Sequence, residues 1–175
     1  MNIVGRLSKS FAFSLLLVVG CTTVPKDAPL FSGLSPQPLD AANVYLLRPH
    51  NDFGYAVSPV VFFNGTKVVT LPDSTYTVFR VPAGVYAITT ERAQWWSGGW
   101  DVRGELKAEN GQAYFLVLDR ETKQHSGVVV VGTTPSPTLR TEVLNEGWVP
   151  YYREDATRML ARLRFVKPEI QALAN

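Results

Sequence analysis

Short apolar runs separated by turn residues fill most of the chain after residue 43. Val60–Phe63 and Lys67–Leu71 flank the dipeptide Asn64-Gly65. Asn-Gly readily adopts the positive φ angles of a two-residue turn, so these runs predict a β-hairpin. From residue 102 to 109, apolar or small residues alternate with charged ones, which is the period of a strand with one solvated face.

The remaining runs continue this pattern. Pro82-Ala83-Gly84 and Asn110-Gly111 predict further turns. About eight or nine short strands, spaced by about 8–12 residues, predict an all-β fold: an antiparallel β-sandwich over residues 42–149. The other strands predicted from these runs are Val44–Arg48, Tyr76–Val81, Val85–Glu91, Ala113–Leu118, Val128–Val131 and Leu139–Val143.

The pattern changes near the C-terminus, where apolar residues recur at the spacing of one helix face and charged residues lie between them. Pro150 suits a helix start and Pro168 stops a helix, so residues 150–175 predict one amphipathic helix and a tail. We expect this helix to cap the sandwich. Its apolar face consists of Tyr152, Ala156, Met159, Leu160 and Leu163.

Residues 1–20 have the pattern of a secretory signal peptide. Arg6 and Lys9 precede the charge-free run Phe11–Val19, which is too short to span a bilayer. Val18-Val19-Gly20-Cys21 has the form of a lipobox, which predicts cleavage between Gly20 and Cys21 and acylation of the Cys21 thiol by a diacylglyceryl group and fatty acids such as palmitate. Two alternatives stay open: a buried strand or helix at 11–19, and an ordinary cleaved signal beside an unmodified Cys21.

Residues 21–41 predict the lipidated cysteine and a flexible tether. Four prolines lie among Ser, Gly and Asp in this segment, which shows neither a helical nor a strand period. Thr22 follows the cysteine, and resemblance to Gram-negative lipoproteins implies that a residue other than Asp here favours the outer membrane. We therefore expect a protein that is lipid-anchored in the outer membrane and faces the periplasm.

Charge and cysteine content limit the classes of partner and ligand that we expect the chain to bind. Of the 17 Lys and Arg residues, Arg6 and Lys9 lie in the signal, which leaves 15 against 15 Asp and Glu. A neutral domain lacks the basic surface of a nucleic-acid binder, so we expect no nucleic-acid partner. Acylation of the single cysteine leaves no thiol for a disulfide or a thiolate metal site. The sequence holds no phosphate-loop or cofactor fingerprint, so we expect neither a metal nor a cofactor.

Trp95, Trp96 and Trp100 lie within six residues, beside two glycines. Indole rings on a loop stack against sugar rings or become buried at a partner surface, which makes these residues a candidate binding patch. Trp also suits the lipid headgroup region. The alternative is that one or two rings fill an edge of the sandwich while the glycines permit the bend.

Catalytic candidates are sparse. Glycan hydrolysis needs two carboxylates ~5–10 Å apart, and Glu91 and Asp101 bracket the tryptophans, but a chain with 15 acids places some pair near any loop. The two histidines, His50 and His125, lie in polar segments where we expect solvated side chains, and no Gly-x-Ser-x-Gly elbow poses a serine. We predict no enzyme activity, with an envelope hydrolase as a less favoured alternative.

A family resemblance rests on short motifs along the predicted sandwich: Val44-Tyr45, Arg48-Pro49, Asn64-Gly65, Leu71, Tyr76, Pro82-Ala83-Gly84, Gly111 and Tyr114-Phe115. Together with Cys21, this order resembles an uncharacterised family of small bacterial lipoproteins that carry a domain of unknown function. The resemblance covers roughly residues 42–145. It implies a small β-sandwich in the cell envelope and brings no catalytic residues.

These observations favour a non-enzymatic binding or assembly module that its lipid holds at the membrane. An envelope protein and a glycan such as peptidoglycan are the partners open to it, the glycan through the Trp-rich segment. The sequence leaves the partner's identity and the oligomeric state open.

Overall fold

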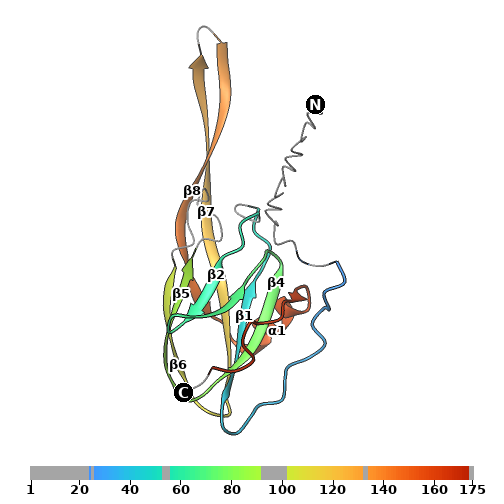
Figure 1. Cartoon of the computed structure of the whole chain (residues 1–175). Coiled ribbons are helices and arrows are strands. Elements are labelled where there is room, and N and C mark those ends of the chain that lie inside the picture. The colour runs from blue at the N-terminus through green and yellow to red at the C-terminus, as the bar shows by residue number, and fades with distance from the viewer. Residues whose placement is uncertain (1–23, 25, 53–55, 92–101, 132–133, 174–175) are drawn as a thin grey trace, which may run out of the picture.

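The computed structural model describes residues 24, 26–52, 56–91, 102–131 and 134–173, and between residues 125 and 145 it describes the backbone. These residues form two β-sheets and one short α-helix (Figure 1). In chain order the elements are β1 (Ala42–Arg48), β2 (Val60–Phe63), β3 (Thr66–Thr70), β4 (Thr75–Val81), β5 (Gly84–Glu91), β6 (Arg103–Ala108), β7 (Ala113–Val131), β8 (Thr134–Pro150), α1 (Arg153–Leu160) and β9 (Arg164–Phe165).

The two sheets face each other as a sandwich, which confirms the predicted all-β fold. The first sheet has the strand order β8-β7-β1-β4-β9 and the second β3-β2-β5-β6. Most neighbours are antiparallel, but β7 runs parallel to β1, and β9 runs parallel to β4. The two parallel pairs were not predicted: a crossover through the second sheet returns the chain beside β1 in the same direction as β1.

The predicted turns are confirmed and shape the sandwich. Asn64 and Gly65 adopt φ angles of 48° and 77°, which close the β2–β3 hairpin. Pro82-Ala83-Gly84 carries the chain from β4 in the first sheet to β5 in the second. Gly111, with φ of 74°, lies in the turn that returns the chain from β6 to β7.

The main core lies between the two sheets. Val44 and Leu46 of β1 pack there with Phe63 of β2, Phe79 of β4 and Ile88 of β5, each at most 2% exposed. The rings of Phe63 and Phe79 meet edge to face, with 5.0 Å between their centres. This contact joins the two sheets near the middle of the core.

Helix α1 covers the outer face of the first sheet, where Ala156 and Leu160 pack with Tyr45. The helix confirms the C-terminal prediction but is shorter than the apolar pattern suggested. The Arg162 N–H donates to the Met159 carbonyl in a tighter turn, which ends the helix and lets the following residues pair with β4 as β9. Tyr152 stands at the N-cap and is 86% exposed, so it does not belong to the buried face.

Part of the predicted tether is held against the sandwich. The Arg164 guanidinium donates to the Ala28 carbonyl at 2.7 Å, and the Phe165 N–H donates to the Pro29 carbonyl at 2.8 Å. The Phe31 ring meets the Tyr76 ring edge-on at 5.8 Å. The free tether is shorter than predicted, because apolar residues between its prolines find partners on the outer face of the first sheet.

Strands β7 and β8 continue far beyond the sandwich as a two-stranded ribbon (Figure 1). We call residues 118–131 and 134–148 the arm. β7 pairs with β1 as far as Val117, whereas its ladder with β8 continues to the pair Val131 and Thr134. The strands predicted at Val128–Val131 and Leu139–Val143 are parts of this ribbon. The ladder of a two-stranded ribbon pairs the backbone whatever the side chains are, so no alternation of apolar and polar residues marked its length in the sequence.

The arm leaves one end of the sandwich, which we call the arm end. Leu47, near the end of β1, pairs with Val117, the last residue of β7 before the arm. Arg48 is level with Thr75 of β4, and Thr75 is level with Arg164 of β9. Since Arg164 binds the Ala28 carbonyl, the N-terminal segment meets the sandwich at this same end.

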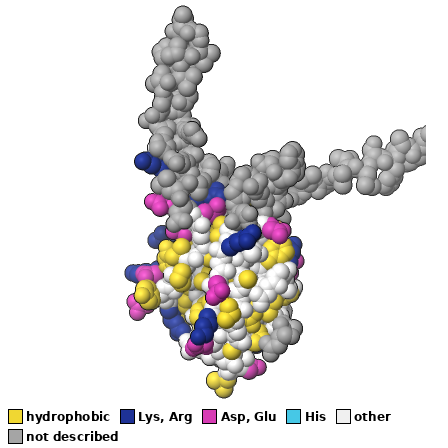
Figure 2. All heavy atoms as spheres, turned by 90° about the vertical axis from the view of Figure 1, so that its left-hand side faces the viewer, with side chains coloured by type: hydrophobic (Ala, Val, Ile, Leu, Met, Phe, Trp, Pro, Cys, Tyr) yellow, Lys and Arg dark blue, Asp and Glu magenta, His cyan; other side chains and the backbone are white. Residues whose placement is uncertain are grey.

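Charged side chains are interspersed over the face of the sandwich that Figure 2 shows, with Lys and Arg beside Asp and Glu. This agrees with the equal numbers of basic and acidic residues in the sequence from residue 21 onward. Within the described ranges, no helix has the length and apolar character needed to cross a membrane.

Candidate functional site

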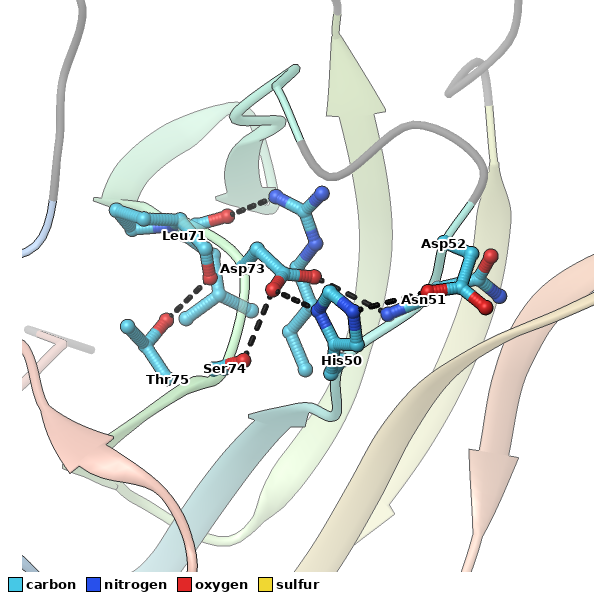
Figure 3. Close-up of polar contacts among 9 residues, drawn as sticks. His50, Asn51, Asp52, Leu71, Asp73, Ser74 and Thr75 are labelled. Carbon is cyan, nitrogen blue, oxygen red and sulfur yellow. Dashed lines mark hydrogen bonds and ion pairs between the residues drawn. The ribbon is translucent and has the colours of Figure 1, made fainter.

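Two turns meet at the arm end and form a polar cluster (Figure 3). One is Pro49–Asp52, after β1, and the other is Pro72–Ser74, before β4. The Asn51 N–H donates to Asp73 Oδ1 at 3.2 Å, and the Ser74 hydroxyl donates to Asp73 Oδ2 at 2.8 Å. Ser74 has a φ of 58°, in the left-handed region that residues other than glycine seldom adopt. Asp73 is therefore the hub of the cluster.

His50 lies between two carboxylates. Its Nδ1 is 2.6 Å from Asp73 Oδ2, and its Nε2 is 3.1 Å from Asp52 Oδ1. The hydrogen bond with Asp73 raises the pKa of His50 most, followed by the charge of Asp73 and then by Asp52. A protonated ring donates from both nitrogens, so this arrangement favours the imidazolium form.

Arg48 places a buried cation beneath the same turns. The residue is 1% exposed, and its Nη1 donates to the Leu71 carbonyl at 2.7 Å. Desolvation lowers the pKa of Arg48 to about 10, although the charge of Asp73 opposes the shift. Arg48 therefore remains charged at neutral pH, and its charge interacts with that of Asp73.

A buried ion pair lies where the arm leaves the sandwich. Arg120 of β7 and Glu146 of β8 are register partners. Nε and Nη2 of Arg120 donate to Glu146 Oε1 at 3.0 and 2.5 Å, and the two side chains are 2% and 14% exposed. Asn51 Nδ2 donates to the Arg120 carbonyl at 3.2 Å, which ties the base of the arm to the polar cluster.

A groove of about 570 Å³ runs between the polar cluster and α1. His50 and Ser74 form one wall, and Tyr151, Met159 and Leu163 give it apolar surface. Asp155, Arg158 and Arg162 supply charged groups along the helix side. This mixture suits a ligand with both polar and apolar parts.

The cluster does not have the arrangement of a serine hydrolase. The Ser74 hydroxyl uses its proton on Asp73, whereas a nucleophilic serine needs its proton on an imidazole base. Both imidazole nitrogens of His50 lie against carboxylates. In the described part of the chain, no three His, Cys, Asp or Glu side chains are placed to hold a metal ion.

Several residues singled out from the sequence lie outside the described residues: Gly20, Cys21, Trp95, Trp96, Trp100 and Asp101. Glu91 is described as the exposed last residue of β5. His125 lies in β7, within the part described by its backbone. His50 is exposed, as predicted, but it is held by two carboxylates instead of being simply solvated.

The described residues on either side of the three tryptophans in the sequence lie at the arm end. Its described flanks are Glu91 and Val102, and Val102 packs with Leu118, the first residue of the arm. Thr90 Oγ1 accepts the Val102 N–H at 2.9 Å, which fixes the two flanks to each other. The loop position predicted for the tryptophans thus has its two ends beside the arm.

Sequence reasoning missed Asp73, Ser74, Arg120 and Glu146. Pro72-Asp73-Ser74 is a turn-forming sequence directly before a strand, and this signal could have marked Asp73 as a turn residue. The pairing of Arg120 with Glu146 depends on the register of a ribbon whose length the pattern did not reveal.

The fold and site define an all-β sandwich protein with a polar cluster and a projecting arm at one end. Residues 38–133 match the family described as "Protein of unknown function (DUF2846)", which is more than half of the chain. The chain belongs to this family, which confirms the prediction of an uncharacterised family. A comparison with curated proteins found no match.

Proposed function

We propose that the protein is a bacterial envelope lipoprotein, anchored through Cys21 in the outer membrane, and that its sandwich is a non-enzymatic binding or assembly module. The lipobox and the charge-free run before it support the anchor. The polar cluster supports the non-enzymatic role, because the Ser74 hydroxyl donates its proton to the Asp73 carboxylate and not to an imidazole nitrogen.

One observation carries this proposal: the exceptional features of the sandwich gather at its arm end. The arm, the polar cluster with its groove, and the N-terminal segment at Ala28 all lie there. A two-stranded ribbon is at best marginally stable in water by itself, so an arm of this length favours a role in contact with a partner surface. A sandwich whose contact groups share one end suits a module held in one orientation.

The anchor is tested by feeding cells a labelled fatty acid and separating membranes from soluble periplasm. We expect label in the membrane-bound protein, and we expect Cys21→Ser to lose the label and to leave the lipidated membrane pool. Cys21→Ser that still carries label, or a wild-type protein that is unlabelled and soluble, contradicts the anchor.

The binding role is tested by photocrosslinking in intact envelopes. A photoreactive amino acid replaces Tyr152, which is 86% exposed beside the groove residue Tyr151, or Val85, which is 57% exposed on β5. Val85 pairs with Lys107, at the end of the sandwich opposite the arm, and serves as the control. We expect a discrete protein adduct from residue 152 and none from residue 85. Equal patterns at both positions contradict a partner at the groove.

Glycan recognition through Trp95, Trp96 and Trp100 is the second candidate function. The position of Glu91 and Val102 beside the arm favours it, because these flanking residues lie at the same end of the sandwich as the groove. We expect the triple Ala variant to lose retention on purified peptidoglycan sacculi, whereas Tyr152→Ala, which also removes an exposed aromatic ring, retains it. Unchanged retention of the triple variant removes this candidate.

A further inference from the structure

We propose that the outer half of the arm, residues 126–131 and 134–139, rests in the headgroup region of the bilayer that holds the lipid anchor. The proposed partner is therefore a lipid surface, and the inference rests on the proposed acylation of Cys21. It assigns a membrane-contact role to the part of the fold that projects beyond the sandwich.

The arm is longer than the stretch of chain that links Cys21 to the sandwich. Cys21 and Ala28, which Arg164 binds at the arm end, are seven residues apart, so the link spans at most ~25 Å. The arm from Leu118 to Val131 is roughly 45 Å long. Because the arm is longer than the link, an arm that points from the anchored end toward the bilayer brings its tip to the lipid surface.

The two halves of the arm differ in amino-acid composition. The inner part of the arm is charged, with Glu121 and Lys123 on β7 and Glu142 on β8. From Ser126 to Leu139, in contrast, the chain holds no ionisable side chain, and Val128–Val131 is a run of four valines. The register pairs Ser126 with Leu139, so the charge-free parts of the two strands coincide and form the outer half of the arm.

Two prolines lie on β8 in the outer half of the arm. Pro137 is opposite Val128, and Pro135 is opposite Val130. Proline is tolerated in a strand where its nitrogen faces away from the partner strand, so the outer edge of β8 lacks two donors here. This disfavours pairing with a strand of a second copy, and it removes two donors that would lose hydration near lipid.

The open edges also limit the depth of the contact. Both edges of a ribbon carry backbone groups that need water or another partner, and the hydrocarbon core offers neither. Seryl and threonyl hydroxyls in the outer half, at Ser126, Thr134, Ser136 and Thr138, suit the hydrated headgroup region. The contact we infer therefore lies at the interface and does not cross the membrane.

The test uses the full lipoprotein purified from membranes and reconstituted into vesicles of phosphatidylethanolamine and phosphatidylglycerol. Cys21 is the single native cysteine, so acylation leaves an introduced cysteine as the only thiol. A fluorescent thiol label is placed at Val130→Cys in the outer arm, at Gln124→Cys in the inner arm, and at Lys107→Cys on β6 at the opposite end. Lipids that carry a nitroxide on the headgroup then quench labels that lie close to them.

We expect quenching at residue 130 to exceed that at residue 107 several-fold, with residue 124 between them. Equal quenching at the three positions overturns the proposal. Quenching at residue 130 that rises with the amount of protein per vesicle and also occurs without the nitroxide lipid overturns the proposal. It indicates contact between copies of the chain. Two labels per chain show a free Cys21 thiol and overturn the anchor with the proposal, whereas one label without quenching overturns the arm contact alone.

Discussion

Arg120 and Glu146 face each other where the arm leaves the sandwich, and two guanidinium nitrogens of Arg120 donate to one oxygen of Glu146. Both side chains are largely buried, at 2% and 14% exposure. A charged pair that has lost its solvation depends on both partners, because removal of one leaves a buried charge without compensation. This pair therefore fixes the geometry of the arm base.

Glu146→Ala is expected to lower the free energy of unfolding by about 3–5 kcal/mol, because it removes the carboxylate that two guanidinium nitrogens of the buried Arg120 contact. Urea denaturation followed by circular dichroism measures the change. The matched control is Glu169→Gln, which breaks a surface ion pair with Lys67 in which both side chains are over 40% exposed. The control substitution should lower the free energy of unfolding by no more than about 1 kcal/mol. Equal effects of the two variants contradict a structural role for the buried pair.

The Asp73–His50 contact predicts a pH dependence. The pKa of His50 is raised from 6.5, so the protonated ring stabilises the fold. This contribution is fully present below pH 6.5 and is lost as the pH rises through the folded pKa. Titration of the two histidine ring signals by NMR should place the His50 midpoint above 6.5.

Two variants distinguish the effects of Asp73 and Asp52 on the pKa of His50. Asp73→Asn should lower the His50 midpoint more than Asp52→Asn does, because Asp73 supplies the largest cause of the shift. The reverse order, or a midpoint that neither variant moves, contradicts the arrangement of the polar cluster.

Phe63→Ala is expected to destabilise the sandwich by about 3–5 kcal/mol, since it removes a fully buried ring and its edge contact with Phe79. Val85→Ala, at a position 57% exposed, should change the free energy of unfolding by no more than about 0.5 kcal/mol. Thermal denaturation of the two variants checks the pair. A mild effect at Phe63 would show that the two sheets do not meet as described.

The sandwich should fold without the outer arm. We expect a chain in which Asn-Gly replaces residues 122–143 to keep its unfolding midpoint, because beyond Val117 β7 pairs with β8 and not with β1. Arg120, Glu146 and the hydrogen bond from Asn51 remain in this variant. Loss of cooperative unfolding would show instead that the arm supports the sandwich.

The turns and most strands could be predicted because their signals are local. Asn64-Gly65 requires positive φ angles, and period-2 alternation in β6 follows directly from one solvated face. The parallel pairing of β1 with β7 could not be predicted, because strand order depends on contacts between residues far apart in the chain. The arm was missed for a related reason: its ladder satisfies the backbone whatever the side chains are.

The candidate site was predictable in part. His50 was visible as a polar turn residue, but its two carboxylate partners belong to different turns, and Asp73 is 23 residues away in the chain. The buried Arg48 ends a largely apolar strand, and a sequence pattern cannot distinguish a buried guanidinium from one that reaches solvent. Three-dimensional packing determines both the partners of His50 and the burial of Arg48.

The proposed lipid anchor and the proposed membrane contact of the arm both depend on acylation of Cys21. Intact-protein mass spectrometry of the wild-type chain extracted from membranes measures it directly. We predict a polypeptide that begins at Cys21 and carries the added mass of a diacylglyceryl group with or without a further acyl chain. A chain that starts at another residue, or that starts at Cys21 with a free thiol, would contradict the lipid anchor and the orientation of the arm derived from it.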